Sequence, residues 1–194
     1  FPLYRILFRG EIIGLQNTPP QGPLVVVANH GSHLDPPLLG HALSRPVAFM
    51  AKKELFKIPI LGAIIKACGA YPVKRGAGDR EAIRTAVARL DQGCAIGIFL
   101  DGTRQPDGRI NKPMHGAALL AAHSAAPLLP VAIVNSHRAL SSGFLLPRLV
   151  PIHLRVGEPL PPPKSRRKAD LESTSQELQK RINAMLDQGL ISHS

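Results

Sequence analysis

The sequence predicts an α/β fold: a single domain in which a central mixed, mostly parallel sheet is covered by helices on both faces. Three observations lead to this prediction. The chain has 194 residues and 44% hydrophobic content, enough for one sizeable core. Short apolar runs of strand length alternate with segments of helical periodicity. These runs are apolar at nearly every position, which is typical of parallel strands buried on both faces.

The strands are predicted from apolar runs bounded by polar or turn residues. The first run, Leu24–Ala28, is apolar at every position. A weaker alternating segment, Ile152–Val156, is predicted to be an edge strand. The remaining runs of this kind are Val47–Ala51, Ala95–Leu100 and Leu129–Val134.

The helices are predicted from apolar spacing and from end signals. The clearest is Asp79–Leu90, which has apolar residues at helical spacing and Gly93 just past its end. Asp35-Pro36 is typical of a helix start, with Asp35 as the N-cap and Pro36 at the first helical position. Further helices are predicted over Leu3–Phe8, Met114–Ala122 and Leu171–Leu186.

Charge and composition narrow the class of protein. Lys and Arg outnumber Asp and Glu by 24 to 13, and a net charge of +11 attracts nucleic acid or anionic lipid. The absence of Trp and an aromatic content of 4% argue against base-stacking platforms. Cys68 and Cys94 are isolated, so we expect free thiols in a reducing compartment. We also expect no signal peptide and no membrane span, because His and Pro interrupt the longest uncharged stretch, 113–137.

The most informative motif, Asn29-His30-Gly31-Ser32-His33-Leu34-Asp35, follows the first apolar run. It places four residues between His30 and Asp35, a spacing at which the carboxylate can reach back and orient the imidazole as a general base. Backbone N–H groups at the following helix start are predicted to stabilise an oxyanion. On spacing alone, the alternative remains that Asp35 is only an N-cap and His30 only a strand-end residue. A metal site that adds His33 and His41 is not expected, since no Cys or Glu joins them.

Three further blocks follow, and the four together resemble the glycerolipid acyltransferases with the HX4D motif, especially the 1-acylglycerol-3-phosphate acyltransferases. The later blocks are Gly69–Arg75, Phe99–Arg104 and Leu129–Ile133. The resemblance covers about 22–135 and implies the glycerolipid acyltransferase fold. We expect one acyltransferase domain over 1–194, with a C-terminal extension over about 159–194.

The resemblance implies roles for particular residues. His30 would take a proton from the acceptor hydroxyl, and Asp35 would hold its ring. Arginines beside such a base suit a phosphate-bearing substrate, because the guanidinium fork matches phosphate oxygens. The sequence departs from the family at Asp101, where Glu is usual, and at Gln105, where Ser is usual. The residues that the resemblance assigns to substrate binding are Lys74, Arg75, Asp101, Gly102, Thr103 and Arg104.

The predicted function is transfer of a fatty acyl group from a thioester carrier to 1-acylglycerol 3-phosphate, giving phosphatidic acid. Acyl-CoA or acyl carrier protein would be a co-substrate, and no bound cofactor or metal is expected. Glycerol 3-phosphate or another lysophospholipid is an alternative acceptor. A non-catalytic basic module for membranes or nucleic acid is an alternative of another class, whereas the acyltransferase needs no nucleic acid.

We expect peripheral attachment to the cytoplasmic side of an anionic membrane. The segment Lys52–Lys66 mixes lysines with large apolar residues. It is interpreted either as a cationic membrane-facing element or as a core helix whose lysines reach out to solvent.

Overall fold

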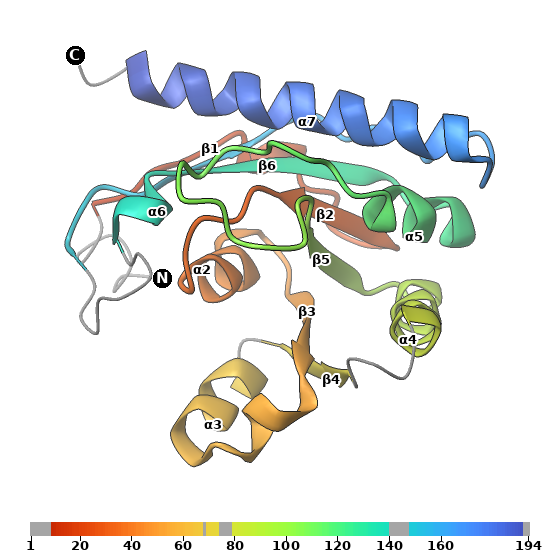
Figure 1. Ribbon diagram of the computed structural model, residues 1–194, viewed down its shortest axis with the longest axis horizontal. Helices are drawn as coiled ribbons and strands as arrows, with labels where there is room; N and C mark the ends of the chain where they lie inside the picture. The colour runs from red at the N-terminus through yellow and green to blue at the C-terminus, as the bar shows by residue number, and fades with distance from the viewer. Residues whose placement is uncertain (1–8, 68, 74–78, 140–147, 192–194) are drawn as a thin grey trace.

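A seven-stranded sheet organises the described part of the chain, in the order β1-β7-β6-β2-β5-β3-β4 (Figure 1). The computed structural model describes residues 9–67, 69–73, 79–139 and 148–191, so the helix predicted over Leu3–Phe8 lies outside it. The strands are β1 (Ile12–Ile13), β2 (Leu24–Ala28), β3 (Val47–Lys52), β4 (Tyr71–Val73), β5 (Ala95–Phe99), β6 (Leu128–Val134) and β7 (His153–Val156).

Helices cover both faces of this sheet, which confirms the predicted fold class (Figure 1). All strand pairs are parallel except β6 with β7. The helices are α2 (Asp35–Ala42), α3 (Pro59–Ala67), α4 (Asp79–Asp91), α5 (Gly116–Ser124), α6 (Ser136–Ala139) and α7 (Lys168–Ile191), with short 3₁₀ turns η1 (Leu15–Asn17) and η2 (Lys53–Lys57).

The central strand β2 is buried on both sides because each of its faces supports a separate core. Val26 and Ala28 join one hydrophobic cluster together with Leu39 of α2. Val25 and Val27 point to the other face and join the cluster built by α4, α5 and α7. The uninterrupted apolar run is therefore explained by burial on both faces.

Two predictions about individual elements were wrong. β7 is not an edge strand: β1 pairs with it on its outer side, through Ile12 with Leu154. Asp35 is the first residue of α2 rather than its N-cap; Leu34 occupies the cap position, and no side chain caps the helix. The Asp35 carboxylate bonds to the preceding loop instead.

The carboxyl ends of β2, β5, β3 and β6 lie at one edge of the sheet, because these strands run parallel. The predicted motif follows β2 at this edge, and the polar loop 100–115 follows β5. Ligands of open α/β sheets bind at such edges. Within the residues described, no helix combines the length and the apolar character needed to cross a membrane.

Candidate active site

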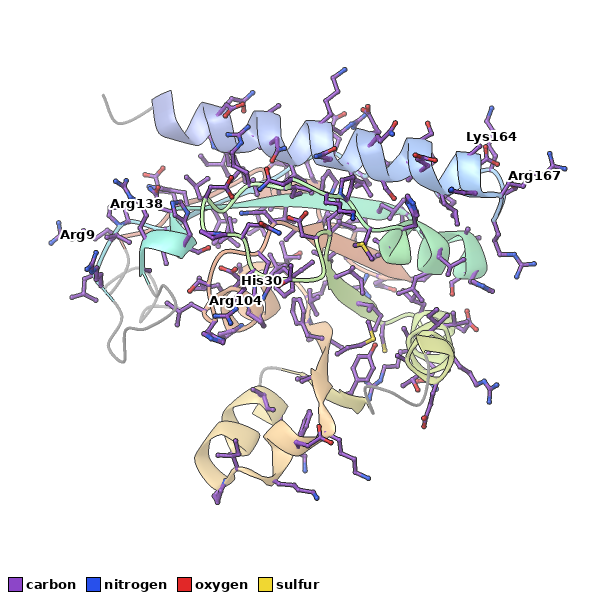
Figure 2. The ribbon with its side chains drawn as sticks, viewed as in Figure 1. Arg9, His30, Arg104, Arg138, Lys164 and Arg167 are labelled. Atoms are coloured by element: carbon purple, nitrogen blue, oxygen red, sulfur yellow. The ribbon has the colours of Figure 1, made fainter. Side chains whose placement is uncertain are left out.

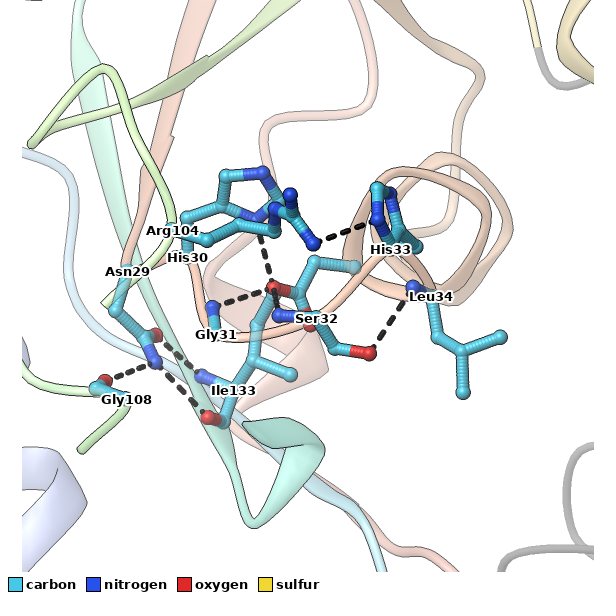
Figure 3. Close-up of polar contacts among 10 residues, drawn as sticks. Asn29, His30, Gly31, Ser32, His33, Leu34, Arg104, Gly108 and Ile133 are labelled. Atoms are coloured by element: carbon cyan, nitrogen blue, oxygen red, sulfur yellow. Dashed lines mark hydrogen bonds and ion pairs between the residues drawn. The ribbon is translucent and has the colours of Figure 1, made fainter. Parts of the chain in front are cut away.

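His30 and Asp35 form a close pair at the end of β2. Nδ1 of His30 lies 2.8 Å from Oδ2 of Asp35, and this oxygen also accepts the N–H groups of Gly31 and Ser32, each at 2.8 Å (Figure 3). A carboxylate only accepts, so this contact places the imidazole proton on Nδ1 and leaves Nε2 as an acceptor. Asp35 is fully buried, whereas the His30 side chain is 16% exposed. The arrangement is that of an oriented base.

An aromatic stack fixes the plane of the His30 ring. The ring of Phe99, at the end of β5, lies parallel to it with centroids 4.0 Å apart and planes 14° apart. Phe49 of β3 stacks in turn on Phe99 at 5.6 Å. Phe49 fits there because Gly97 has no side chain; a Cβ at Gly97 would lie 2.1 Å from the Phe49 ring. Sequence reasoning assigned no role to these residues.

Asn29 links three segments beneath the site. Its buried side-chain amide donates to the carbonyls of Gly108, at 2.7 Å, and Ile133, at 3.0 Å, and its Oδ1 accepts the Ile133 N–H at 2.8 Å (Figure 3). The first block, the fourth block and the loop after β5 are thereby held together. Sequence reasoning missed this role, although a polar amide directly after a fully apolar strand is a signal for it.

The loop after β5 is also bonded to the His30 segment through backbone groups. The N–H of Gln105 donates to the carbonyl of His30 at 2.7 Å, and the N–H of Leu100 donates to the carbonyl of Ala28 at 3.0 Å. These bonds place Arg104 beside His30 (Figure 2). The first and third blocks, which are some seventy residues apart in the sequence, therefore meet at one site.

Arg104 contacts a residue of the first block. Its guanidinium lies 2.6 Å from Nε2 of His33 (Figure 3). Arginine only donates, so the His33 ring accepts at Nε2 and is neutral in this contact. Burial, then the charges of Arg104 and of His30, lowers the pKa of His33, while Asp35 opposes the shift. His33 is thereby a polar neighbour of the candidate base rather than a part of it.

Asp101 is turned toward its own loop. It is 7% exposed, and its Oδ1 accepts the N–H of Lys112 at 2.9 Å. Burial raises the pKa of the Asp101 carboxyl, against the lowering effect of backbone hydrogen bonds from Lys112 and Asn111. These contacts fit a loop-holding role. Gly102 next to it has a φ of 67°, a conformation that favours glycine, and Thr103 is exposed.

The prediction that backbone N–H groups at the start of α2 stabilise an oxyanion was wrong. The N–H groups of Gly31 and Ser32 are bound to Asp35, and the N–H of Leu34 donates to the hydroxyl of Ser32 at 3.2 Å. Pro36 and Pro37 have no N–H to offer. These groups are therefore used to shape the loop.

The second block lies further from His30. Its strand β4 is the third strand from β2, about 14 Å away at the usual spacing between strands. Lys74 and Arg75 follow β4 but lie outside the described residues, so their assignment to substrate binding stays a prediction. Among the residues that are described, no three His, Cys, Asp or Glu side chains are grouped as metal ligands.

Comparisons with known proteins identify the family to which this chain is similar. The family model described as Acyltransferase matches residues 9–134. The 1-acyl-sn-glycerol-3-phosphate acyltransferase of Bacillus subtilis is 32% identical over 92% of this chain and 90% of its own. The lyso-ornithine lipid O-acyltransferase of Pseudomonas aeruginosa is 36% identical over 59% of this chain and 44% of its own.

A solved structure is also similar. The 1-acyl-sn-glycerophosphate acyltransferase of Thermotoga maritima superposes with a TM-score of 0.72 and 27% identity, covering 91% of this chain and 73% of that one. Chloroplast relatives from Brassica napus and Arabidopsis thaliana are longer, and the chain spans only about 40% of their length. The extent of the family match and the relative from Bacillus subtilis show that the chain belongs to the acyltransferase family.

Proposed function

We propose that the chain transfers a fatty acyl group from a thioester to the free hydroxyl of 1-acylglycerol 3-phosphate, which gives phosphatidic acid. The observation that carries this proposal is the buried, triply bonded Asp35 carboxylate at 2.8 Å from Nδ1 of His30. This contact leaves Nε2 of a partly exposed imidazole free of its proton, as a general base requires. The names of the relatives support the choice of acceptor.

His30 acts as the base in this mechanism. Its Nε2 takes the proton of the acceptor hydroxyl while that oxygen attacks the thioester carbonyl. The new C–O bond forms, the C–S bond breaks, and the thiolate leaves with the proton returned by the imidazolium. Asp35 stabilises the imidazolium and stays ionised. Phe99 keeps the ring from rotating away from the acceptor.

The acceptor phosphate is bound by the loop after β5 in this proposal. Arg104 presents a guanidinium beside His30, and a guanidinium can donate two parallel hydrogen bonds to phosphate oxygens. Gly102 lets the backbone approach, Thr103 adds a hydroxyl, and Asp101 holds the loop. Lys74 and Arg75 are proposed to complete the phosphate site.

The carrier and the membrane are the remaining proposed partners. Acyl-CoA or acyl carrier protein serves as co-substrate, and base chemistry of this kind needs no resident cofactor. Both carriers are acidic, and the chain carries a net charge of +11. The same charge favours peripheral attachment to the anionic cytoplasmic side of a membrane.

A second acceptor class is supported by one comparison. The relative from Pseudomonas aeruginosa is named for a lyso-ornithine lipid. A lysolipid without a glycerol phosphate would use the same base but would not need Arg104. Acylation of such a lysolipid, or of glycerol 3-phosphate, is therefore the alternative to test.

A thioester-release assay with the purified protein tests the proposal. We expect thiol release from acyl-CoA or acyl carrier protein only when a lysolipid acceptor is present, and phosphatidic acid as the product by mass spectrometry. An acceptor screen in the same assay ranks 1-acylglycerol 3-phosphate, glycerol 3-phosphate and lyso-ornithine lipid. Absence of thiol release with every acceptor would favour a basic binding module instead.

A further inference from the structure

The segment Lys53–Ala67, here called the η2–α3 unit, stands apart from the two cores. Figure 1 shows α3 projecting from the body on the side opposite α7. In the described residues α3 packs on η2, and η2 in turn contacts only β3 and β4 extensively. Gly62 allows the tight packing within the unit, because a Cβ there would lie 2.5 Å from the carbonyl oxygen of Phe56.

The unit is strongly apolar for a surface element. Lys66 is the one charged residue of the nine in α3. No described side chain of the unit joins either hydrophobic core. Ile58, between η2 and α3, is 48% exposed, which makes it one of few large apolar side chains that face solvent in the described structure. Phe56 and Ile65, the other large apolar side chains of the unit that the structure describes, are half-buried and also lie outside both cores, which favours the membrane-facing interpretation of the segment over the core helix.

Three lysines belong to the same unit as the exposed Ile58. Lys53, Lys57 and Lys66 are exposed and form no ion pair within the described chain, and Glu54 is the single acidic residue of the unit. An exposed Ile58 on an apolar helical segment, together with lysines that form no ion pair in the described chain, matches an anionic lipid interface, where apolar groups enter the acyl boundary and lysines meet the headgroups.

The unit also lies at the edge of the sheet that carries His30. β3 and β2 both run parallel to β5, so η2 leaves β3 at the same edge at which His30 leaves β2. An element docked on a bilayer at this edge would keep the candidate base near the lipid surface, where an acylated acceptor resides.

We propose that the η2–α3 unit is the surface by which this protein docks on an anionic bilayer. A stable protein partner needs about 800 Å² on each side. A nine-residue helix is only about 14 Å long, so this unit is small for such an interface. A bilayer imposes no such minimum, because a few side chains and lysines already give binding. This inference rests on the proposed function in that it places the acyl transfer at a bilayer surface, but its main test does not depend on catalysis.

Fluorescence measures docking directly, because the chain contains no Trp. Ile58→Trp places a single reporter on the unit. Gln176→Trp places the same reporter on an exposed position of α7, on the opposite side of the molecule, as the matched control. With vesicles of phosphatidylcholine and phosphatidylglycerol, we expect a blue shift and quenching by bromolipid for Ile58→Trp alone. Pure phosphatidylcholine should give a much smaller response.

Charge removal provides the second measurement. Each lysine near an anionic surface contributes about fivefold to partitioning, so Lys53→Gln, Lys57→Gln and Lys66→Gln together should weaken vesicle binding on the order of a hundredfold. The control removes three charges from the exposed cluster before α7, by Lys164→Gln, Arg166→Gln and Arg167→Gln. That cluster lies away from His30 in Figure 2, and we expect a much smaller loss.

A soluble acceptor separates docking from catalysis. With a short-chain, monomeric 1-acylglycerol 3-phosphate, the triple lysine variant should turn over like the original protein, and with vesicle-embedded acceptor it should be slower. If no variant turns over any acceptor, the proposed function fails while the vesicle data still test docking. Docking is overturned by equal responses of the two Trp reporters, by equal losses in the two triple variants, or by a blue shift without lipid, which would indicate self-association.

Discussion

The two halves of the candidate site are built with different rigidity. On the side of the base, Asp35 is fully buried and one of its oxygens has three contacts, while Phe99 stacks on the His30 ring. On the side of the phosphate, Arg104 has one contact to the exposed His33. The base is thus oriented before substrate binds, whereas the arginine keeps freedom to adjust. Substitutions on the first side should reduce kcat, and those on the second should raise the KM of the acceptor.

The largest effect is expected at the base. His30→Ala should lower kcat by about 10² to 10⁴, because a positioned general base contributes that much to the rate. Asp35→Asn should be similarly damaging, since an amide in place of the carboxylate does not stabilise the imidazolium. Steady-state kinetics and circular dichroism check activity and fold, with the exposed His123→Ala as control. A folded His30→Ala protein of near-normal kcat would contradict the mechanism.

The next effect is expected at Asn29, which joins the rigid half to its surroundings. Asn29→Ala should lower the free energy of unfolding by about 1–3 kcal/mol, because the buried Ile133 N–H loses its partner. It should also lower kcat, since the loop after β5 loses its bond at Gly108. Chemical denaturation and kinetics measure both.

The control for Asn29 is Asn17→Ala, which removes one side-chain bond, to the Val156 carbonyl, and does not touch the Gly108 and Ile133 contacts of the site. We expect a smaller loss of stability there and no change in kcat. Equal kcat values for the two variants would show that the amide network does not position the site.

A smaller effect, confined to KM, is expected at Arg104. A hydrogen bond to a charged group contributes about 1.5–3 kcal/mol, so Arg104→Ala should raise the acceptor KM by about ten- to a hundredfold. Arg104→Lys should recover part of this, because a point charge lacks the bidentate fork. Arg167→Ala removes the same charge at a distance (Figure 2) and serves as control.

An acceptor without phosphate sharpens this test. The original protein should discriminate strongly against it, and Arg104→Ala should discriminate much less. If both proteins show the same preference for the phosphorylated acceptor, Arg104 is not a phosphate ligand and is only a loop charge.

The smallest effect is expected at His33. Since the charge of Arg104 contributes to the lowered pKa of His33, Arg104→Ala should raise that pKa toward 6.5, although burial, the larger cause, remains. As the pH falls through the lowered pKa, His33 gains a proton and can no longer accept from Arg104. NMR titration of the imidazole measures this, and an unchanged pKa in Arg104→Ala would argue against the contact in solution.

The fold was largely predictable because its strongest signals are local. Leu24–Ala28 and Leu128–Val134 are apolar because both of their faces are buried, and no polar residue interrupts them, although Pro130 lies within the second. β7 was misplaced at an edge because its outer partner, β1, has only two residues, too few for a periodic pattern. The prediction for β7 therefore failed because the pairing depends on β1, a segment too short to show a strand pattern in the sequence.

The candidate site was predictable in its parts but not in its contacts. The pairing of His30 with Asp35 follows from their spacing, and the geometry matches it. Phe99 and Asn29 were missed because stacking on a ring and bridging three segments are set by the sheet register, which spacing within one block does not encode. The hydrogen bonds from the Gly31 and Ser32 N–H groups to Asp35 could not be predicted either, because they depend on the backbone conformation of the loop.

The pairing of β2 has a consequence for how the protein is made. Its partners are far along the chain: Leu24 pairs with Ala95, and Val25 with Leu128. During synthesis β2 therefore leaves the ribosome long before either neighbour exists, with an apolar edge that can pair with other chains. Such distant pairings fold slowly. His30 can thus reach its final surroundings only after β6 has been translated, and nascent chains that end before Leu128 should be the most prone to aggregate.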